Sequence, residues 1–338
     1  MNKLHLKSLR SLKPSNLTIG CAFLQSPKET NQILTTAINL GVTDFDTTPL
    51  YQHGKMEEYL GHAIKQLSPT EQSSLRIFTK CGRLLNENGT ITNDYTADGT
   101  LTSLQSSIDR LGIAPYGLRI HDPNDSMDRP LHIDEVGVAL GQHGMANMLK
   151  EIQQQGIIQS IGIGMNTNVE TTDNTTSKLA SLPPSLTDGV PAEVERMIDG
   201  MVPNINEALL AGGFTLLTQV GIESMLKCQK DKVNVAAAGI FSTGLLVGKT
   251  QYAYQQAPTE LIDRANKWEV LAKEFGFTLP EVAIAFVNLP VCVTRVVVGV
   301  ATVEELVDNI RAAERSGDVP TELWREAEHR RLIEVGIV

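Results

Sequence analysis

Short apolar runs alternate with longer amphipathic stretches from about residue 17 to residue 311 of this chain of 338 residues. The runs have the length of β-strands, and the stretches between them have the spacing of helices with one apolar face. Such alternation predicts a parallel sheet covered by helices, and eight units predict closure into a (β/α)8 TIM barrel of the α/β class. The predicted strands span residues 17–23, 42–46, 77–80, 117–121, 159–164, 214–219, 233–238 and 296–299.

Helical patterns fill most of the intervals between the predicted strands. They span residues 29–40, 56–66, 101–111, 133–155, 191–201, 258–275 and 279–288. Two segments fall outside the eightfold pattern, an elongated polar loop near residues 167–190 and a last helix near residues 321–334. Because the eight units use most of the chain and no low-complexity linker divides it, we expect residues 1–338 to form one domain.

The chain carries 29 Lys and Arg residues against 39 Asp and Glu residues, a formal net charge of -10. A chain this acidic, without a basic run, is not expected to bind nucleic acid or anionic membranes. No stretch reaches the ~18 apolar residues of a membrane span. The four cysteines form no C-x-x-C pair, which favours reduced thiols in a cytoplasmic protein over a zinc site or a disulfide framework. We therefore expect a small-molecule partner, no bound metal, and a monomer or a weak homo-oligomer.

Several predicted strands end in a polar residue. Asp46 closes one strand, Lys80 the next and His121 the one after it, while Tyr51 lies five residues beyond Asp46 in the loop FDTTPLY. In an α/β barrel the C-terminal ends of the strands meet at one rim, where active sites are built. Taken singly, each residue has an ordinary explanation: a turn-capping Asp, a packed Tyr, a solvated Lys, a hydrogen-bonded His. Together they place an acid, a phenol, an ammonium and an imidazole on one rim.

These four groups are a coherent set for proton transfer coupled to a redox step. A phenol titrates near pH ~10 in water, which is too high for proton exchange at neutrality. A nearby ammonium such as that of Lys80 favours the phenolate of Tyr51, and Asp46 would hold the ammonium in place. His121 could donate a hydrogen bond to the substrate oxygen. No serine stands in a G-x-S-x-G turn, so a serine hydrolase is not indicated.

The segments FDTTPLY with MEEYLGHAI, then IFTK, then LRIHDPND, resemble the aldo-keto reductase superfamily in sequence and in order. Three further segments add to the resemblance, which runs from about residue 17 to residue 309: SLQSSIDRLG, IFSTGLL and VVVGVATVEELVDNI. Within the superfamily, GMN at residues 164–166 together with ALLAGGFTLLTQ is similar to one sugar-oxidising branch. That branch includes galactose, fucose and threo-aldose 1-dehydrogenases and pyridoxal 4-dehydrogenase.

The resemblance implies an NAD(P)-dependent oxidoreductase that transfers a hydride between the nicotinamide and the C1 of an aldose, or an aldehyde or alcohol. Tyr51 would be the general acid and base, with Asp46, Lys80 and His121 completing the catalytic set. The residues implied to bind the cofactor are Asn166 and Gln219 at the carboxamide, Phe241, Ser242 and Gly244 at the pyrophosphate, and Gly299, Thr302, Glu305 and Asn309 at the adenosine. Phe241 as a core residue and Thr302 as a helix N-cap are the alternatives, but the matching order of the segments favours the cofactor role. Candidates for the substrate wall are Phe23, Leu50, Gln52 and His53.

The expected cofactor is NAD, with NADP as the alternative. Many members of the family bind the 2′-phosphate of NADP with a basic residue where this chain has Ala301, and the nearby Glu305 carboxylate also disfavours a second phosphate. A Rossmann fingerprint is absent, because Gly162 and Gly164 are followed by Thr167 at the third glycine position.

Other functions remain open on the sequence. The chain could be an NADPH-dependent aldehyde or ketone reductase, or a non-catalytic nucleotide-binding barrel, although such a module usually lacks one of the four rim residues. GLLVGKT resembles a phosphate-binding loop, but Thr243 stands where its first glycine is needed. A metal-dependent hydrolase would have to use His132, Asp134, Glu135 and His143, which fall away from the predicted strand ends.

Overall fold

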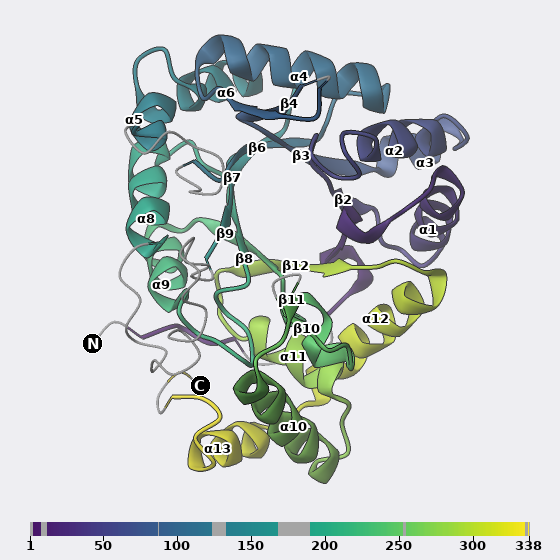
Figure 1. Cartoon of the computed structure of the whole chain (residues 1–338), viewed down its shortest axis with the longest axis vertical. Coiled ribbons are helices and arrows are strands. Elements are labelled where there is room, and N and C mark those ends of the chain that lie inside the picture. Colours follow the sequence, from purple (N-terminus) through teal and green to yellow (C-terminus); the bar gives the residue numbers. More distant parts are fainter. Residues whose placement is uncertain are drawn as a thin grey trace.

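Eight parallel strands close into a barrel with helices around it, as the computed structural model shows (Figure 1). The structure describes residues 3–7, 12–86, 88–123, 133–167, 190–252, 255–334 and 337. Around the barrel the strands follow their order in the chain, and the last strand pairs with the first. The predicted (β/α)8 fold is confirmed. The strands are β1 (Leu17–Gly20), β2 (Asp44–Asp46), β3 (Arg76–Cys81), β6 (Gly117–His121), β7 (Ser160–Asn166), β8 (Glu207–Ala211), β9 (Asn234–Ala238) and β12 (Val293–Gly299).

One predicted strand is wrong. The barrel uses β8 over Glu207–Ala211, whereas residues 214–219 form a turn after the strand. In this turn the Thr215 amide donates to the Thr218 carbonyl over 2.7 Å, and the Thr215 hydroxyl accepts from the Leu217 amide. The actual strand begins with Glu207. A charged residue argues against a buried strand in the sequence, and the ion pairs that Glu207 forms inside the barrel are known only from the structure.

The helices largely occupy the predicted intervals. The sequence predicts one helix over residues 133–155, whereas the structure has two helices there. The helical stretch is interrupted at Gly144, which lies very close to the first of these helices. A Cβ at Gly144 would lie 2.3 Å from the Val138 carbonyl oxygen. Three further helices, α3, α9 and α12, were not among the predicted ranges. The helices are α1 (Pro27–Asn39), α2 (Met56–Ile64), α3 (Pro69–Ser74), α4 (Ala97–Leu111), α5 (Glu135–Leu140), α6 (Met145–Gln154), α8 (Val190–Met201), α9 (Ile222–Asp231), α10 (Thr259–Glu274), α11 (Leu279–Val287), α12 (Val303–Arg315) and α13 (Thr321–His329).

Smaller elements and two predictions complete the description. Two-stranded hairpins form from β4 (Arg83–Leu85) with β5 (Ile91–Asn93) and from β10 (Gln251–Tyr252) with β11 (Gln255–Gln256). A 3-10 segment, η3 (Ser242–Val247), follows β9. The polar loop predicted near 167–190 falls on residues 168–189, which lie outside the described residues. The expectation that residues 1–338 form one domain stays a prediction.

Helix ends follow from local residue chemistry. Helix α4 begins after Thr96, whose hydroxyl accepts a hydrogen bond from the Gly99 amide, and it ends at Gly112 in the left-handed conformation (φ 74°) that glycine adopts without strain. Ser26 caps α1 in the same way, and Pro27 occupies the first helical position. These caps set where each helix leaves the barrel wall.

A buried carboxylate joins the outer helices to the barrel. Glu57 of α2 is fully buried, accepts hydrogen bonds from Thr79 of β3 (2.6 Å) and Ser107 of α4 (3.0 Å), and pairs with Arg110 at 2.6 Å. Gly61 permits the close packing of α2 on α4, since a Cβ there would lie 2.1 Å from the Arg110 carbonyl oxygen. The segments MEEYLGHAI and SIDRLG therefore meet for a structural reason.

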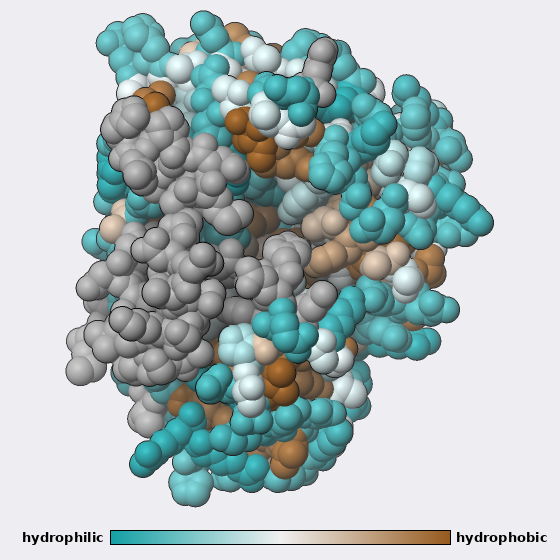
Figure 2. Space-filling model, in the orientation of Figure 1, coloured by the Kyte–Doolittle hydropathy of each residue, from teal (hydrophilic) through white to brown (hydrophobic). Residues whose placement is uncertain are grey.

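Most of the hydrophobic core lies between the strands and the helices. Figure 2 shows mostly hydrophilic side chains on the outer helices of this face, with smaller hydrophobic areas between them. All four cysteines are buried, and none of them forms a disulfide in the structure. Of the helices in the described part of the chain, none has both the length and the apolar character needed to cross a membrane.

Candidate active site

One large cavity opens at the C-terminal ends of the barrel strands. Its volume is about 1510 Å³, above the ~300–1000 Å³ of ordinary small-molecule pockets. It continues from the strand ends past η3 to residues of α10, α11 and α12. The residues at the strand ends that line it come from all eight strands: Gly20, Asp46, Lys80, His121, Gly164, Leu209, Ala238 and Gly299 among them. The rim predicted from the sequence is therefore a cavity with room for more than one small molecule.

Lys80 is fixed at the floor of this cavity. Its ammonium lies 2.7 Å from Asp46 Oδ1 and donates a second hydrogen bond to the Thr47 carbonyl oxygen over 2.9 Å. Both side chains of the ion pair are only 4% exposed. Gly164 of β7 makes space for the lysine, because a Cβ there would lie 3.3 Å from Lys80 Cε. Since the pair is shielded from solvent, its charges interact more strongly than a surface pair would.

Tyr51 stands over the lysine. Its ring centre lies 5.6 Å from the Lys80 ammonium, and the ring lines the same cavity. Three consecutive residues after it, Gln52, His53 and Gly54, take left-handed φ angles of 52°, 53° and 87°, so the loop turns sharply beneath the ring. The Tyr51 carbonyl accepts hydrogen bonds from the Gly54 and Met56 amides. The tight turn therefore ties the tyrosine to the start of α2.

His121 completes the group of four. It ends β6, lines the cavity and has Thr48 Oγ1 at 3.5 Å from its Nδ1. Burial, and then the positive charges of Lys80 and Arg83, hold the pKa of His121 well below its usual value. The imidazole is therefore neutral at neutral pH, and a neutral imidazole can donate one hydrogen bond to an oxygen in the cavity.

The sequence reasoning missed Asp122, which holds Asn166 at the cavity wall. Asp122 accepts from the Asn166 backbone amide (2.9 Å) and from its side-chain amide (3.1 Å). Its own backbone has a φ of 42°, uncommon for a residue with a side chain, and Tyr95 donates to the carbonyls of both His121 and Asp122. Arg83 lies 3.7 Å from Asp122 and also lines the cavity. Asp122 directly follows His121, and Arg83 stands three residues after Lys80, but the strained conformation of Asp122 is visible only in three dimensions.

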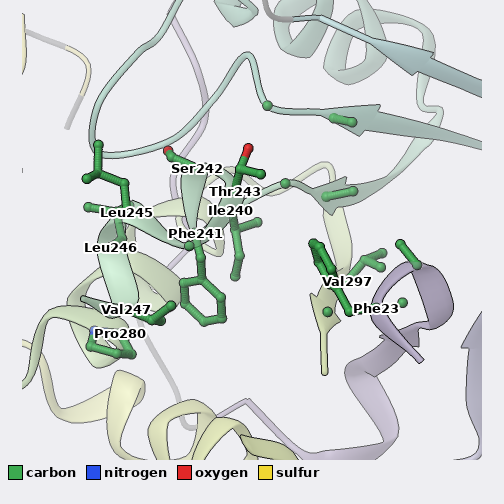
Figure 3. Close-up of a pocket in the computed structure, with 18 of the residues that line it drawn as sticks. Phe23, Ile240, Phe241, Ser242, Thr243, Leu245, Leu246, Val247, Pro280 and Val297 are labelled. Carbon is green, nitrogen blue, oxygen red and sulfur yellow. The ribbon is translucent and has the colours of Figure 1, made fainter. Parts of the chain in front are cut away.

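The η3 segment forms a second wall of the cavity. Ser242, Thr243 and Gly244 take left-handed φ angles of 49°, 57° and 105°, and at Gly244 a Cβ would lie 2.7 Å from Lys249 Cδ. In Figure 3, Ile240 and Phe241 lie on one side of the pocket, with Phe23 and Val297 on the opposite side. Phe23 is 38% exposed and covers Gly299, where a Cβ would lie 2.7 Å from the phenyl ring.

Seven of the nine predicted cofactor residues line the cavity together with the four catalytic candidates. They are Asn166, Phe241, Ser242, Gly244, Gly299, Glu305 and Asn309. Gln219 and Thr302 are not among the lining residues. Gln219 is buried and donates from its side-chain amide to the Thr215 carbonyl (2.6 Å), and Thr302 caps α12 by accepting from the Glu305 amide. Of the predicted substrate residues, Phe23 lines the cavity, whereas Leu50, Gln52 and His53 are not among its lining residues.

A network of buried ion pairs fills the barrel below the cavity, and it too was missed. Arg119 of β6 pairs with the second oxygen of Asp46 and with Glu207 of β8. Glu207 also pairs with Arg295 of β12 at 2.6 Å, and Arg295 reaches Asp44 at 3.0 Å. Successive side chains of a strand point to opposite faces, and these charged residues stand at inward-facing positions between outward-facing neighbours. The two-residue period was therefore a signal in the sequence that they point into the barrel. Their meeting depends on closure of the barrel.

The residues weighed for a metal-dependent hydrolase do not form a site in the described structure. Asp134 pairs with Arg196 on the outer helices, and Glu135 accepts from Asn93, while His132 lies outside the described residues. Among the residues that the structure describes, no group of three or more His, Cys, Asp or Glu side chains could hold a metal ion.

Comparisons with known proteins agree with this architecture. The Aldo/keto reductase family model matches residues 17–190, just over half of the chain. The chain therefore belongs to the aldo/keto reductase family, and it is an oxidoreductase that uses a nicotinamide cofactor, NAD(P)(H).

The chain is also similar over most of its length to curated relatives. D-threo-aldose 1-dehydrogenase of Pseudomonas sp is 28% identical over 334 residues, which cover 91% of this chain and 89% of the relative. Pyridoxal 4-dehydrogenase of Microbacterium luteolum is 25% identical over 342 residues, with 91% and 90% covered. L-galactose dehydrogenase of Arabidopsis thaliana is 24% identical, with 92% and 89% covered.

Solved structures share the fold at lower identity. An aldo-keto reductase of Bacillus halodurans in its holo form superposes with a TM-score of 0.67 at 17% identity, covering 99% of this chain and 98% of that one. A glycerol dehydrogenase of Gluconobacter oxydans gives a TM-score of 0.66 at 15% identity, covering 97% and 94%. These likenesses concern the fold.

Proposed function

We propose that the protein interconverts an aldose, at C1, with its oxidised product, or an alcohol with an aldehyde, and that Tyr51 is the general acid and base. One observation carries the proposal: the Lys80 ammonium, held by Asp46 at 2.7 Å, lies 5.6 Å from the centre of the Tyr51 ring inside the cavity. A buried cation at this distance stabilises the phenolate. Curated relatives named for aldose, L-galactose and pyridoxal dehydrogenation support the substrate class.

The cavity residues fit a dinucleotide cofactor. The cavity is large enough for cofactor and substrate together, and the left-handed turn at Ser242–Gly244 brings backbone close to the space that the Phe241 ring borders. We assign Asn166 to the carboxamide end, Phe241, Ser242 and Gly244 to the pyrophosphate, and Gly299, Glu305 and Asn309 to the adenosine. The buried Gln219 Oε1 has no hydrogen-bond partner among the described residues, so Gln219 stays a candidate that would have to rotate to reach the carboxamide.

The chain's own groups then divide the chemistry. When bound, the nicotinamide supplies or accepts the hydride. In oxidation, the Tyr51 phenolate takes the proton of the substrate hydroxyl, and in reduction the phenol returns it. Neutral His121 donates a hydrogen bond to the same substrate oxygen and so orients it. Phe23 and Val297 form an apolar wall of the cavity, on the side opposite Ile240 and Phe241 (Figure 3).

We propose NAD as the preferred cofactor. Glu305 is held by the Ala301 amide (2.8 Å), so a carboxylate occupies the place where a 2′-phosphate would need a cation. A second candidate is an NADPH-dependent aldehyde or ketone reductase. The observation that favours it is Lys249, whose ammonium lies 3.4 Å from the other Glu305 oxygen and would be available to a phosphate after a small rotation.

The experiment is a panel of aldoses, pyridoxal and simple aldehydes with NAD(H) or NADP(H), followed by nicotinamide absorbance, on the wild type and on Tyr51→Phe. We expect Tyr51→Phe to lower kcat about 100-fold or more while cofactor binding is retained. Tyr59→Phe is the matched control, because Tyr59 lies on α2, is partly buried against the core and is not among the cavity residues, and this variant should retain full activity. Full activity of Tyr51→Phe would refute the assignment, and nucleotide binding without turnover by the wild type would indicate a non-catalytic barrel.

A further inference from the structure

We propose that Arg119 is a positioning residue for the catalytic group, because it neutralises Asp46 from below and so leaves the charge of Lys80 to act on Tyr51. The inference rests on the proposed role of Tyr51 and deepens it. Nothing in the motif resemblance pointed to this residue, which lies two positions before His121 in the strand sequence GLRIH.

The contacts of Asp46 carry the first step. Its Oδ1 faces Lys80, and its Oδ2 faces the Arg119 guanidinium, so one carboxylate lies between two cations. The Arg119 side chain is 1% exposed, and Lys80 and Arg119 are register partners on the neighbouring strands β3 and β6. Without Arg119, the negative charge of Asp46 would be opposed by Lys80 alone, and an ion pair of net zero charge does little to stabilise a phenolate.

The remaining groups that face Arg119 carry the second step. Glu207 accepts from Arg119 Nε at 3.0 Å, and Arg295 balances Glu207 from the other side. Asp44, at the start of β2, is shared by Arg295 and Arg76. Counted over the described members, the network has one more cation than anion. Its cations are Lys80, Arg119, Arg295 and Arg76, and its anions are Asp46, Glu207 and Asp44.

Packing keeps this surplus charge in place. The Phe78 ring contacts both guanidinium groups, with Arg119 at 4.5 Å and Arg295 at 4.6 Å from its centre, and the π-system of the ring attracts both cations. Burial by itself would disfavour the charged form of Arg119, but Glu207 and Asp46 outweigh it, and the pKa of Arg119 is raised. Arg119 therefore stays charged at any pH at which the enzyme works. In a protein with a formal charge of -10, it supplies local positive charge beneath the phenol.

The test compares Arg119→Met with Arg76→Met. Arg76 belongs to the same network, but it pairs with Asp44 at the opposite end of the strands and its side chain is 32% exposed. We would titrate the Tyr51 phenol from the ultraviolet phenolate band, as the difference between each variant and the same variant carrying Tyr51→Phe. The pH profile of alcohol oxidation and the circular dichroism spectrum would be recorded alongside.

Arg119→Met is expected to move the Tyr51 titration and the acidic limb of the oxidation profile to higher pH by about one unit. This is the scale for one unit charge about 10 Å away at an effective dielectric of about 20. Arg76→Met should leave both within about 0.3 unit, since solvent screens the more distant and more exposed charge.

A second variant covers the risk that Arg119→Met does not fold, because it leaves Asp46 and Glu207 short of a partner. Arg119→Met with Glu207→Gln removes one buried anion together with the cation. The network then keeps its surplus of one cation while Asp46 still loses its second partner, so the shift should have the same direction but be smaller. Unchanged titration in a folded Arg119 variant, or an equal shift in Arg76→Met, would overturn the inference. If the wild type itself is inactive, or if Tyr51→Phe is fully active, the proposed function fails instead, so the two failures are distinguishable.

Discussion

Replacement of Lys80 by methionine removes the cation next to the phenol and keeps an unbranched side chain that is one heavy atom shorter. The ammonium lies 5.6 Å from the Tyr51 ring centre. At an effective dielectric of about 20, a unit charge at this distance stabilises the phenolate by about 3 kcal/mol, or about two pKa units. Alcohol oxidation needs the phenolate, so kcat at neutral pH should fall about 100-fold and should recover about tenfold for each unit of higher pH.

The fold should survive this substitution. Breaking a buried ion pair costs about 3–5 kcal/mol when the remaining charge is left without a partner. Asp46 keeps Arg119 in the Lys80→Met variant, so the free energy of unfolding should fall by less than that. A loss of activity without a loss of fold can therefore be assigned to the missing cation.

The assay is the pH dependence of kcat for alcohol oxidation, with the cofactor dissociation constant and the urea midpoint measured in parallel. Lys227→Met is the matched control, because Lys227 is also a lysine held by ion pairs, with Asp199 and Asp231, but on the outer helices. Its profile should match that of the wild type. A folded Lys80→Met enzyme with an unshifted profile would refute the view that Lys80 stabilises the phenolate.

Two further predictions concern the cofactor and the response to pH. Glu305→Lys should shift the preference from NAD toward NADP by about tenfold or more in kcat/KM, because it replaces a carboxylate by a cation beside Lys249. The measurement is the ratio of kcat/KM with NAD to kcat/KM with NADP. An unchanged ratio would contradict the placement of the adenosine. Acidification should destabilise the fold through His121, whose pKa is lowered in the folded state, so the unfolded chain binds the extra proton below pH ~6.5. Stability should fall by up to about 1.4 kcal/mol per pH unit from there down to the folded pKa, and urea midpoints of the wild type should approach those of His121→Gln as the pH falls. Parallel curves for the two proteins would count against a buried neutral imidazole.

Much of the barrel could be predicted because its signals are local. β6 was predicted with both ends correct, and β9 and α11 to within one residue at each end, since apolar runs and cap residues lie within the segments themselves. β8 was misplaced because its first residue is a charge whose partners come from other strands. The single helix predicted over 133–155 was wrong because the close approach at Gly144 cannot be read from its neighbours in sequence.

The candidate site divides in the same way. The polar ends of β2, β3 and β6 identified Asp46, Lys80 and His121, because parallel strands in a barrel bring their C-terminal ends to one rim. Seven cofactor candidates followed from the family resemblance and line the same cavity. Asp122 and Arg83 were missed, because their contacts are with residues that are distant in sequence: Asp122 binds Asn166, and Arg83 lies near Asp122.

The sequence by itself therefore determined the barrel and the chemistry of its rim, through hydrophobic periodicity and polar residues at strand ends. Tertiary structure alone decided what lies beneath the rim. Arg119, Glu207 and Arg295 come from strands far apart in the chain, and they meet only when the barrel closes and turns their side chains inward. A charge inside a barrel needs a partner of opposite sign within a few ångströms, and that distance is a property of the folded chain.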